Sequence, residues 1–131
     1  MEDWKIKIAM LWLVYECGSI VTFIFDAWSP GWIENTTAGT IQGLKITPEL
    51  LLVFAIIYVI PPVMAFLVLT LKDSINRWLN IILSIVLAVL ATYGMVPFFT
   101  QLAAWSIPVW ISQVGANALI VWYAWKSKQK A

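Results

Sequence analysis

Histidine is absent from this sequence of 131 residues, and cysteine occurs once, as Cys17. The commonest proton shuttle and the imidazole metal ligand are therefore missing. A single cysteine also excludes an intramolecular disulfide and any metal site built from several cysteines. We expect no metal and no cofactor, and several classes of enzyme are excluded.

Charged residues are scarce as well, at 11% of the chain, whereas 62% of the residues are hydrophobic. A soluble domain carries about 25% charged residues. Runs of roughly 20 apolar residues, the length that crosses a bilayer as a helix, cover residues 6–28, 48–71, 78–97 and 106–125. The sequence predicts one all-α integral membrane domain over residues 1–131, a bundle of four transmembrane helices with an outer loop at residues 29–47.

Basic residues are distributed unevenly around these runs. Lys45 lies in the outer loop, and the other seven of the eight Lys and Arg residues lie near the two termini or between the second and third runs. Because cytoplasmic segments carry the excess of Lys and Arg, we expect both termini in the cytoplasm and the protein in the cell membrane. The basic tail predicts contact with anionic membrane lipids, and nothing indicates nucleic-acid binding.

Glu16 lies in the middle of the first apolar run, within YECGS, and shares a helix face with Leu13 and Ile20. A charged carboxylate at that depth costs roughly 3 kcal/mol on insertion scales unless it is protonated, hydrated or paired. No Lys or Arg lies near the middle of any run. Ionisable residues at such depth mark functional sites by default, so we expect Glu16 to form the centre of a site.

Other polar groups are predicted at a similar depth. The double proline at residues 61–62 removes two backbone donors close to Tyr58, and the helix is expected to kink or open there. Gln113 and Asn117 lie one turn apart on the fourth helix. With Glu16 and Tyr58 they are expected to line the bundle interior, and packing between helices is the alternative interpretation of both amides.

Four further residues complete the predicted ligand-binding site. Trp12 lies one turn before Glu16, where it would add a cation–π contact. Tyr93 lies on the third helix. Asp26 and Glu49, near the outer surface, would make the entrance mildly acidic. The predicted set is Trp12, Glu16, Asp26, Glu49, Tyr58, Tyr93, Gln113 and Asn117.

The outer loop is expected to fold over the entrance of the bundle. It contains turn signals at Pro30-Gly31 and Ala38-Gly39, which favour a short hairpin or a re-entrant cap. Its apolar residues, which such a fold would bury, are Trp32, Ile33, Ile41, Leu44 and Ile46.

The chain contains the stretches TIQGLKITPELL, NRWLNI and VWYAWKSK besides the double proline, and it carries Asp26 late in the first helix, in FIFDAWSPG. These features resemble those of a family of small prokaryotic membrane proteins with four helices and no known function. The resemblance implies a topology and a prokaryotic origin, and it implies no activity. In size, number of spans and membrane Glu the chain is also similar in architecture to the small multidrug resistance transporters, whose loops are much shorter.

Three functions follow from these observations. The first is binding or transport of a small hydrophobic or cationic molecule at an intramembrane site centred on Glu16. The second is an intramembrane isomerase or lyase that acts on a lipid-like substrate with Glu16 and Asp26 as acid and base. The third is a structural or accessory subunit, and a homo-oligomer is compatible with all three. The sequence favours the first, because an isolated carboxyl can exchange a proton for a cation.

Overall fold

The computed structural model describes residues 3–41, 43–101 and 103–127. Its long helices are α1 (Asp3–Trp28), α3 (Pro48–Leu67), α4 (Asp73–Thr100) and α5 (Ser106–Lys126). All four are long and apolar enough to cross a membrane. α3 ends and α4 begins earlier than expected. Hydropathy missed the polar start of α4 at residues 73–77, whereas the mostly apolar residues 68–71 form a turn and do not extend α3.

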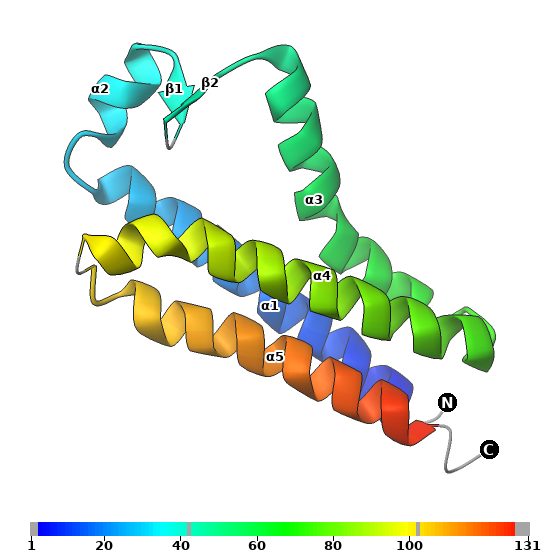
Figure 1. Cartoon of the computed structure of the whole chain (residues 1–131). Coiled ribbons are helices and arrows are strands. Elements are labelled where there is room, and N and C mark those ends of the chain that lie inside the picture. The colour runs from blue at the N-terminus through cyan, green and yellow to red at the C-terminus, as the bar shows by residue number, and fades with distance from the viewer. Residues whose placement is uncertain (1–2, 42, 102, 128–131) are drawn as a thin grey trace.

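The four helices run alternately up and down (Figure 1). α1 and α4 run from the end of the bundle that holds both chain termini to the opposite end. We call these the termini end and the loop end. α3 and α5 run in the opposite direction, from the loop end to the termini end. Along the backbone, α4 packs on α5, α5 on α1 and α1 on α3, so α1 and α4 meet mainly through long side chains.

The core joins the helices from the termini end to their middle. Trp12 is fully buried, and its Nε1 donates a hydrogen bond to Oδ1 of Asn80 at 2.7 Å, which links α1 to α4. Asn80 in turn donates to the carbonyl of Asn76 at 2.7 Å. Asn76 donates to the carbonyl of Val68 at 2.7 Å. This chain satisfies buried polar groups that would otherwise each cost about 1–3 kcal/mol.

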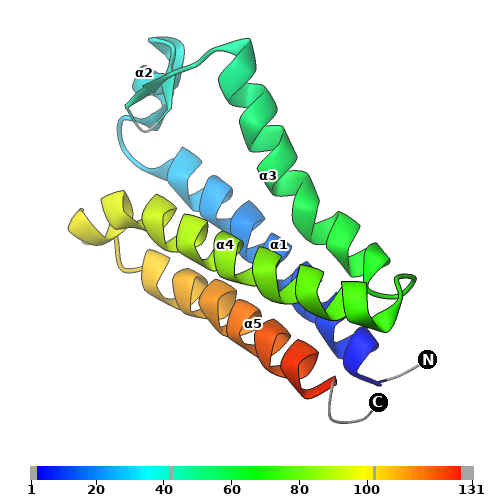
Figure 2. The same ribbon diagram turned by 45° about the vertical axis from the view of Figure 1, so that its right-hand side comes forward.

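α3 departs from the other helices toward the loop end. Its buried residues are Pro61, Met64 and Ala65, all in the half nearer the termini end, and Figures 1 and 2 both show its first turns diverging from the bundle. The helix does not open at the double proline, since α3 is helical from Pro48 to Leu67 without a break. The alternative, a kink at that point, stays a prediction. Pro61 packs in the core.

The segment between α1 and α3 folds into a small cap, as expected from its turn signals. It contains α2 (Trp32–Thr37) and an antiparallel hairpin of β1 (Thr40–Ile41) and β2 (Leu44–Lys45). Its turns use Gly31, Gly39 and Gly43 at φ of 86°, 88° and 80°, a region that glycine adopts without strain. The cap buries less than expected, because Ile33 and Leu44 remain 70% and 51% exposed.

Candidate functional site

Two neighbouring residues in the middle of α1 have opposite surroundings. Tyr15 is buried, and its hydroxyl donates a hydrogen bond to the carbonyl of Leu87 on α4 at 3.2 Å. Glu16 follows on a face that continues through Leu13 and Ile20, which are 45% and 53% exposed. Leu13 and Ile20 therefore do not line the bundle interior, and Glu16 lies between them and the buried Trp12 and Ser19, which are also its neighbours at one-turn spacing. Hydropathy gave no sign of this, because both faces of α1 are apolar.

Glu16 has an unsatisfied carboxyl group. The residue is partly buried, and its Oε2 atom is buried without a hydrogen-bond partner. α3, which carries Tyr58, packs on α1. Tyr58 is itself 48% exposed. Tyr58 and Glu16 therefore lie on neighbouring helices, and both side chains are at least partly exposed.

The backbone of α3 adds acceptors at the same level. A helical carbonyl normally accepts from the N–H four residues later, and proline has no N–H. Pro61 and Pro62 inside α3 therefore leave the carbonyls of Ile57 and Tyr58 without that bond. The region between α1 and α3 thus offers acceptors in excess of donors, and this balance suits a cation or a ligand with N–H or O–H groups.

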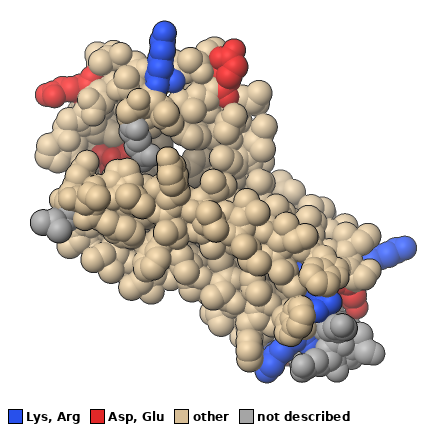
Figure 3. All heavy atoms as spheres, in the orientation of Figure 1, with Lys and Arg blue, Asp and Glu red and all other residues tan. Residues whose placement is uncertain are grey.

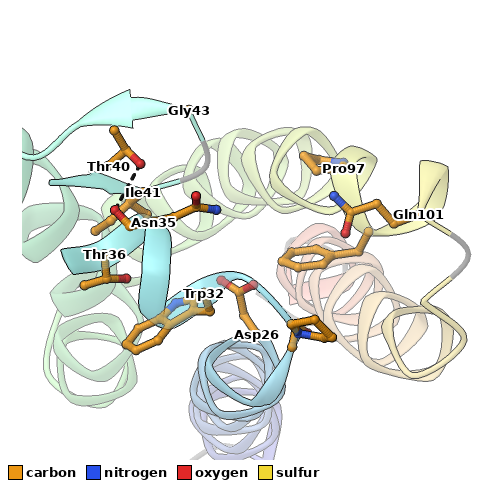
Figure 4. A pocket seen from close by; sticks show the side chains of 12 residues that line it. Asp26, Trp32, Asn35, Thr36, Thr40, Ile41, Gly43, Pro97 and Gln101 are labelled. Carbon is orange, nitrogen blue, oxygen red and sulfur yellow. Dashed lines mark hydrogen bonds between the residues drawn. The ribbon is translucent and has the colours of Figure 1, made fainter. Parts of the chain in front are cut away.

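A cavity of about 350 Å³ lies at the loop end, a volume within the range of small-molecule sites. Its wall is formed by the ends of α1 and α4, by α2 and by the hairpin. Figure 4 shows the Asp26 carboxylate pointing into this space, between Trp32 and the end of α4 that carries Gln101. Asp26 is the one charged residue of the lining, and Asn35 and Thr36 add neutral polar groups.

The cap is held over this cavity by specific contacts. The ring of Trp32 on α2 meets that of Phe23 on α1 edge to face, with their centroids 6.3 Å apart. Within the cap, the hydroxyl of Thr40 donates to the carbonyl of Asn35 at 3.1 Å, drawn as the dashed line in Figure 4. The position of the cavity wall is therefore set by packing between α1 and α2 and by the turn before the hairpin.

Two predicted site residues lie in the core. Trp12 is enclosed and bonded to Asn80, as described above. Gln113 on α5 is 4% exposed, and its Nε2 donates to Oγ of Ser19 at 3.0 Å and to the carbonyl of Tyr15 at 3.4 Å. Both side chains thus join helices, and the expectation that Gln113 shares an interior with Glu16 is corrected.

Asn117 is also buried in the core, at 2% exposed, with neither of its side-chain polar atoms bonded. The hydroxyl of Ser84 on α4 is in the same state. Asn117 therefore makes no hydrogen bond to Glu16. The predicted cluster divides by burial into two residues that are at least partly exposed, Glu16 and Tyr58, and two core residues, Gln113 and Asn117.

The remaining two candidates lie on the surface. Tyr93 on α4 is 79% exposed. Glu49 is exposed in the first turn of α3, where the helix dipole stabilises a negative charge. Thr47 caps the same helix by accepting from the N–H of Leu50 at 3.1 Å. The structure brings neither Tyr93 nor Glu49 to Glu16, and a role for them in ligand binding stays a prediction.

Sequence reasoning missed the polar wall of the cavity. Asn35, Thr36 and Thr40 come from the cap, and Gln101 follows the last turn of α4. The available signal was the concentration of Asn and Thr between the first two apolar runs. Gln101 had no comparable signal, because its approach to Asp26 depends on how α1 and α4 pack.

The described residues contain no group of three acidic or cysteine side chains placed to hold a metal ion. Residues 1–130 match the model of a family of unknown function, DUF6326, and the chain belongs to that family. The match confirms the resemblance to an uncharacterised family. No curated protein matches the chain, and no solved structure does. A function must therefore be argued from the geometry.

Proposed function

We propose that this member of DUF6326 is an integral membrane protein that binds or transports a small hydrophobic or cationic molecule. Glu16 is the centre of the site, Tyr58 flanks it, and Asp26 receives the ligand at the loop end. The observation that carries the proposal is the carboxyl of Glu16, in the middle of an apolar helix, with a buried oxygen that has no partner.

A carboxyl group in this position binds either a proton or a cation. Charge in an apolar environment is costly unless it is compensated, so the group is neutral when empty and ionised when a cation lies beside it. Tyr58 and the free carbonyls of α3 provide further acceptors for the same ligand. Uptake of the ligand and release of a proton are therefore coupled at one side chain.

Asp26 and its cavity serve as the entrance in this proposal. The carboxylate attracts cations, Trp32 provides an aromatic face for a hydrophobic cation, and the amides of Asn35 and Gln101 line the rest. Both acids lie on α1, and α3, which carries Tyr58, packs on that helix. This arrangement supports a path between the entrance and the central site along α1.

The proposed orientation places the termini end in the cytoplasm. In Figure 3 charged residues gather at the two ends of the molecule. Lys5, Lys7, Lys72, Arg77 and Lys126 lie at the termini end, and Lys45 alone lies at the loop end among described Lys and Arg residues. Excess Lys and Arg on one side of a membrane protein mark its cytoplasmic side.

The orientation is testable by cysteine labelling. With Cys17 replaced by serine, a cysteine placed after Ala131 should react with a membrane-impermeant maleimide only after the cells are opened. A cysteine replacing Thr37 in the cap should react in intact cells. Labelling of the C-terminal cysteine in intact cells would reverse the proposed orientation.

Ligand binding is testable with tetraphenylphosphonium, a hydrophobic cation. The purified protein should bind it in detergent with release of a proton, and binding should weaken as the pH is lowered, because the proton competes for the carboxylate. Glu16→Gln should reduce the affinity at least about tenfold, since a charge-assisted contact is worth about 1.5–3 kcal/mol. Glu34→Gln is the matched control, because Glu34 is exposed on α2 and its substitution makes the same change in charge.

Calorimetry in buffers of low and high ionisation enthalpy measures both the affinity for the probe and the number of protons released. If Glu16→Gln binds the probe as tightly as the unmodified protein and releases the same number of protons, Glu16 is an ordinary buried acid and the proposal fails. Equal losses in the Glu16 and Glu34 variants would mean that the probe senses net charge alone.

The geometry disfavours the isomerase or lyase. Glu16 and Asp26 lie about 15 Å apart along α1 at 1.5 Å per residue, too far to act as acid and base on one carbon skeleton of modest size.

One observation favours an accessory subunit: the half of α3 nearer the loop end buries no residue within the chain. That function predicts that Glu16→Gln leaves every binding property unchanged and that a partner helix covers this half of α3.

A further inference from the structure

Arg77 occupies an unusual place at the termini end, apart from the site around Glu16. It lies in the second turn of α4 and is 8% exposed. Its guanidinium carbon lies 4.8 Å from the ring centroid of Trp78 and 4.8 Å from that of Trp125 on α5. Two stretches far apart in the sequence, NRWLNI and VWYAWKSK, therefore meet at one cation.

Among the described residues, no acid forms an ion pair with the guanidinium of Arg77. Its Nε and Nη2 atoms are buried and have no hydrogen-bond partner. Asp73, the acid in the first turn of the same helix, is engaged by Lys5, with Nζ 2.8 Å from Oδ1. Aromatic faces attract the charge of a guanidinium, yet they leave its N–H donors, which lie in the plane of the group, unsatisfied. A buried cation in this state favours binding of an anion.

The surroundings of Arg77 are basic and aromatic. Lys126 lies over the ring of Trp122 at 4.7 Å, and Lys7 lies over the ring of Tyr123 at 5.3 Å. Figure 3 shows Lys and Arg side chains gathered at this end of the visible face. Among the described residues of this end, Asp3 and Asp73 are the acids. The local field thus attracts anions to Arg77.

An apolar surface adjoins the same position. Trp78 is followed along one side of α4 by Ile82, Ile85 and Val89, which are 55%, 53% and 63% exposed. Residues at this spacing share a face of a helix. An anion with a hydrocarbon chain can place its charge at Arg77 and its chain along this stripe, whereas a free inorganic anion gains nothing from the stripe.

We propose that Arg77 binds the phosphate group of an anionic phospholipid, with Trp78 and Trp125 stacked on the guanidinium and the acyl chains against the exposed stripe of α4. Trp78 and Trp125 are 50% and 53% exposed, and binding of the phosphate requires that these rings turn and open the N–H donors to it. Arginine matches phosphate in a planar, two-point contact. A zwitterionic headgroup is less suited, because the positive charges of Lys126 and Lys7 disfavour its ammonium.

The test compares retention of phosphatidylglycerol and phosphatidylcholine by native mass spectrometry of the purified protein. The unmodified protein should prefer phosphatidylglycerol, and Arg77→Gln should reduce the apparent affinity for it about tenfold, as expected for loss of one charge-assisted contact. Lys72→Gln is the control, because Lys72 is an exposed cation at the start of the same helix. Its effect should be about threefold or less, since exposed charges interact weakly.

Two further arms separate the source of the phosphate and guard against misfolding. Inorganic phosphate at millimolar concentration should leave the bound phosphatidylglycerol in place. If Arg77→Gln does not fold, a phosphatidylglycerol carrying a photoreactive group near its headgroup should crosslink the unmodified protein within residues 73–82 or 122–127. The proposal is overturned by equal retention of both lipids, by unchanged preference in Arg77→Gln, by displacement with inorganic phosphate, or by crosslinks confined to other segments.

Discussion

Tyr15 and Glu16 are neighbours in α1, and their different surroundings separate two kinds of polar group in an apolar helix. Tyr15 is buried and bonded to α4, whereas Glu16 is partly buried with a partnerless oxygen. A polar side chain that joins two helices contributes to stability through its bond. A polar side chain without a partner does not stabilise the fold through a hydrogen bond, so it is the better candidate for function.

The same contrast holds between the two ends of the bundle. From the termini end to the middle, Trp12, Asn80 and Asn76 form a continuous chain of short hydrogen bonds. Toward the loop end, α3 diverges and the carboxyl group of Asp26 lines a cavity, while Glu16 is partly buried in the middle of α1. Rigid packing in one half thus positions an accessible, electronegative surface in the other.

The largest expected effect tests whether the packed half carries the stability. Trp12→Ala removes a fully buried ring and the bond to Asn80, and it should lower the free energy of unfolding by about 3–5 kcal/mol. Trp28→Ala, at a position that is 75% exposed, should change it by less than about 0.5 kcal/mol. Unfolding by sodium dodecyl sulfate measures the stability of both variants. Equal losses of stability would contradict the claim that the packed half carries the stability.

An intermediate effect tests the close approach of α1 and α5. A Cβ on Gly18 would lie 2.7 Å from Cγ of Gln113, so Gly18→Ala must displace that side chain from its bonds to α1. We expect a loss of about 1–3 kcal/mol, typical of overpacking.

The control for that substitution is Gly115→Ala on α5, where an added Cβ meets nothing within 4 Å. It should be neutral or stabilise the protein by up to about 1 kcal/mol through helix propensity. Thermal unfolding in detergent compares the two. A harmless Gly18→Ala would show that Gln113 adapts and that its bonds contribute little.

The smallest expected effect on stability sharpens the contrast between Gln113 and Glu16. Glu16→Gln should change the free energy of unfolding by no more than about 0.5 kcal/mol, because no hydrogen bond is lost. Gln113→Leu, similar in volume, should cost about 1–2 kcal/mol, because the hydrogen bonds from Nε2 to Oγ of Ser19 and to the carbonyl of Tyr15 are lost. A larger loss for Glu16→Gln than for Gln113→Leu would assign Glu16 to the packing of the bundle.

Local composition was sufficient to predict the helices and the cap. Each helix is specified by its own run of apolar residues, and Gly31 and Gly39 indicate turns whatever the rest of the chain does. The absence of a basic partner for Glu16 was also predictable from the local sequence, because no Lys or Arg lies near the middle of any run. The grouping of side chains was predicted less well. Gln113 was expected to share a site with Glu16, and it instead bonds to Ser19 and to the backbone of Tyr15, which joins α5 to α1.

The sequence by itself determined that four apolar helices form, that one carboxyl lies in the middle of the first, and that basic residues concentrate at one end, because length, hydropathy and charge belong to single segments. Only the tertiary structure decided which face of α1 packs on α5 and α4. In a chain that is apolar on all sides, hydropathy does not distinguish a face toward a helix from a face toward lipid. The side chains that Asp26 and Arg77 meet, Trp32 and Gln101 for the first and Trp125 for the second, were likewise fixed by packing between segments distant in the sequence.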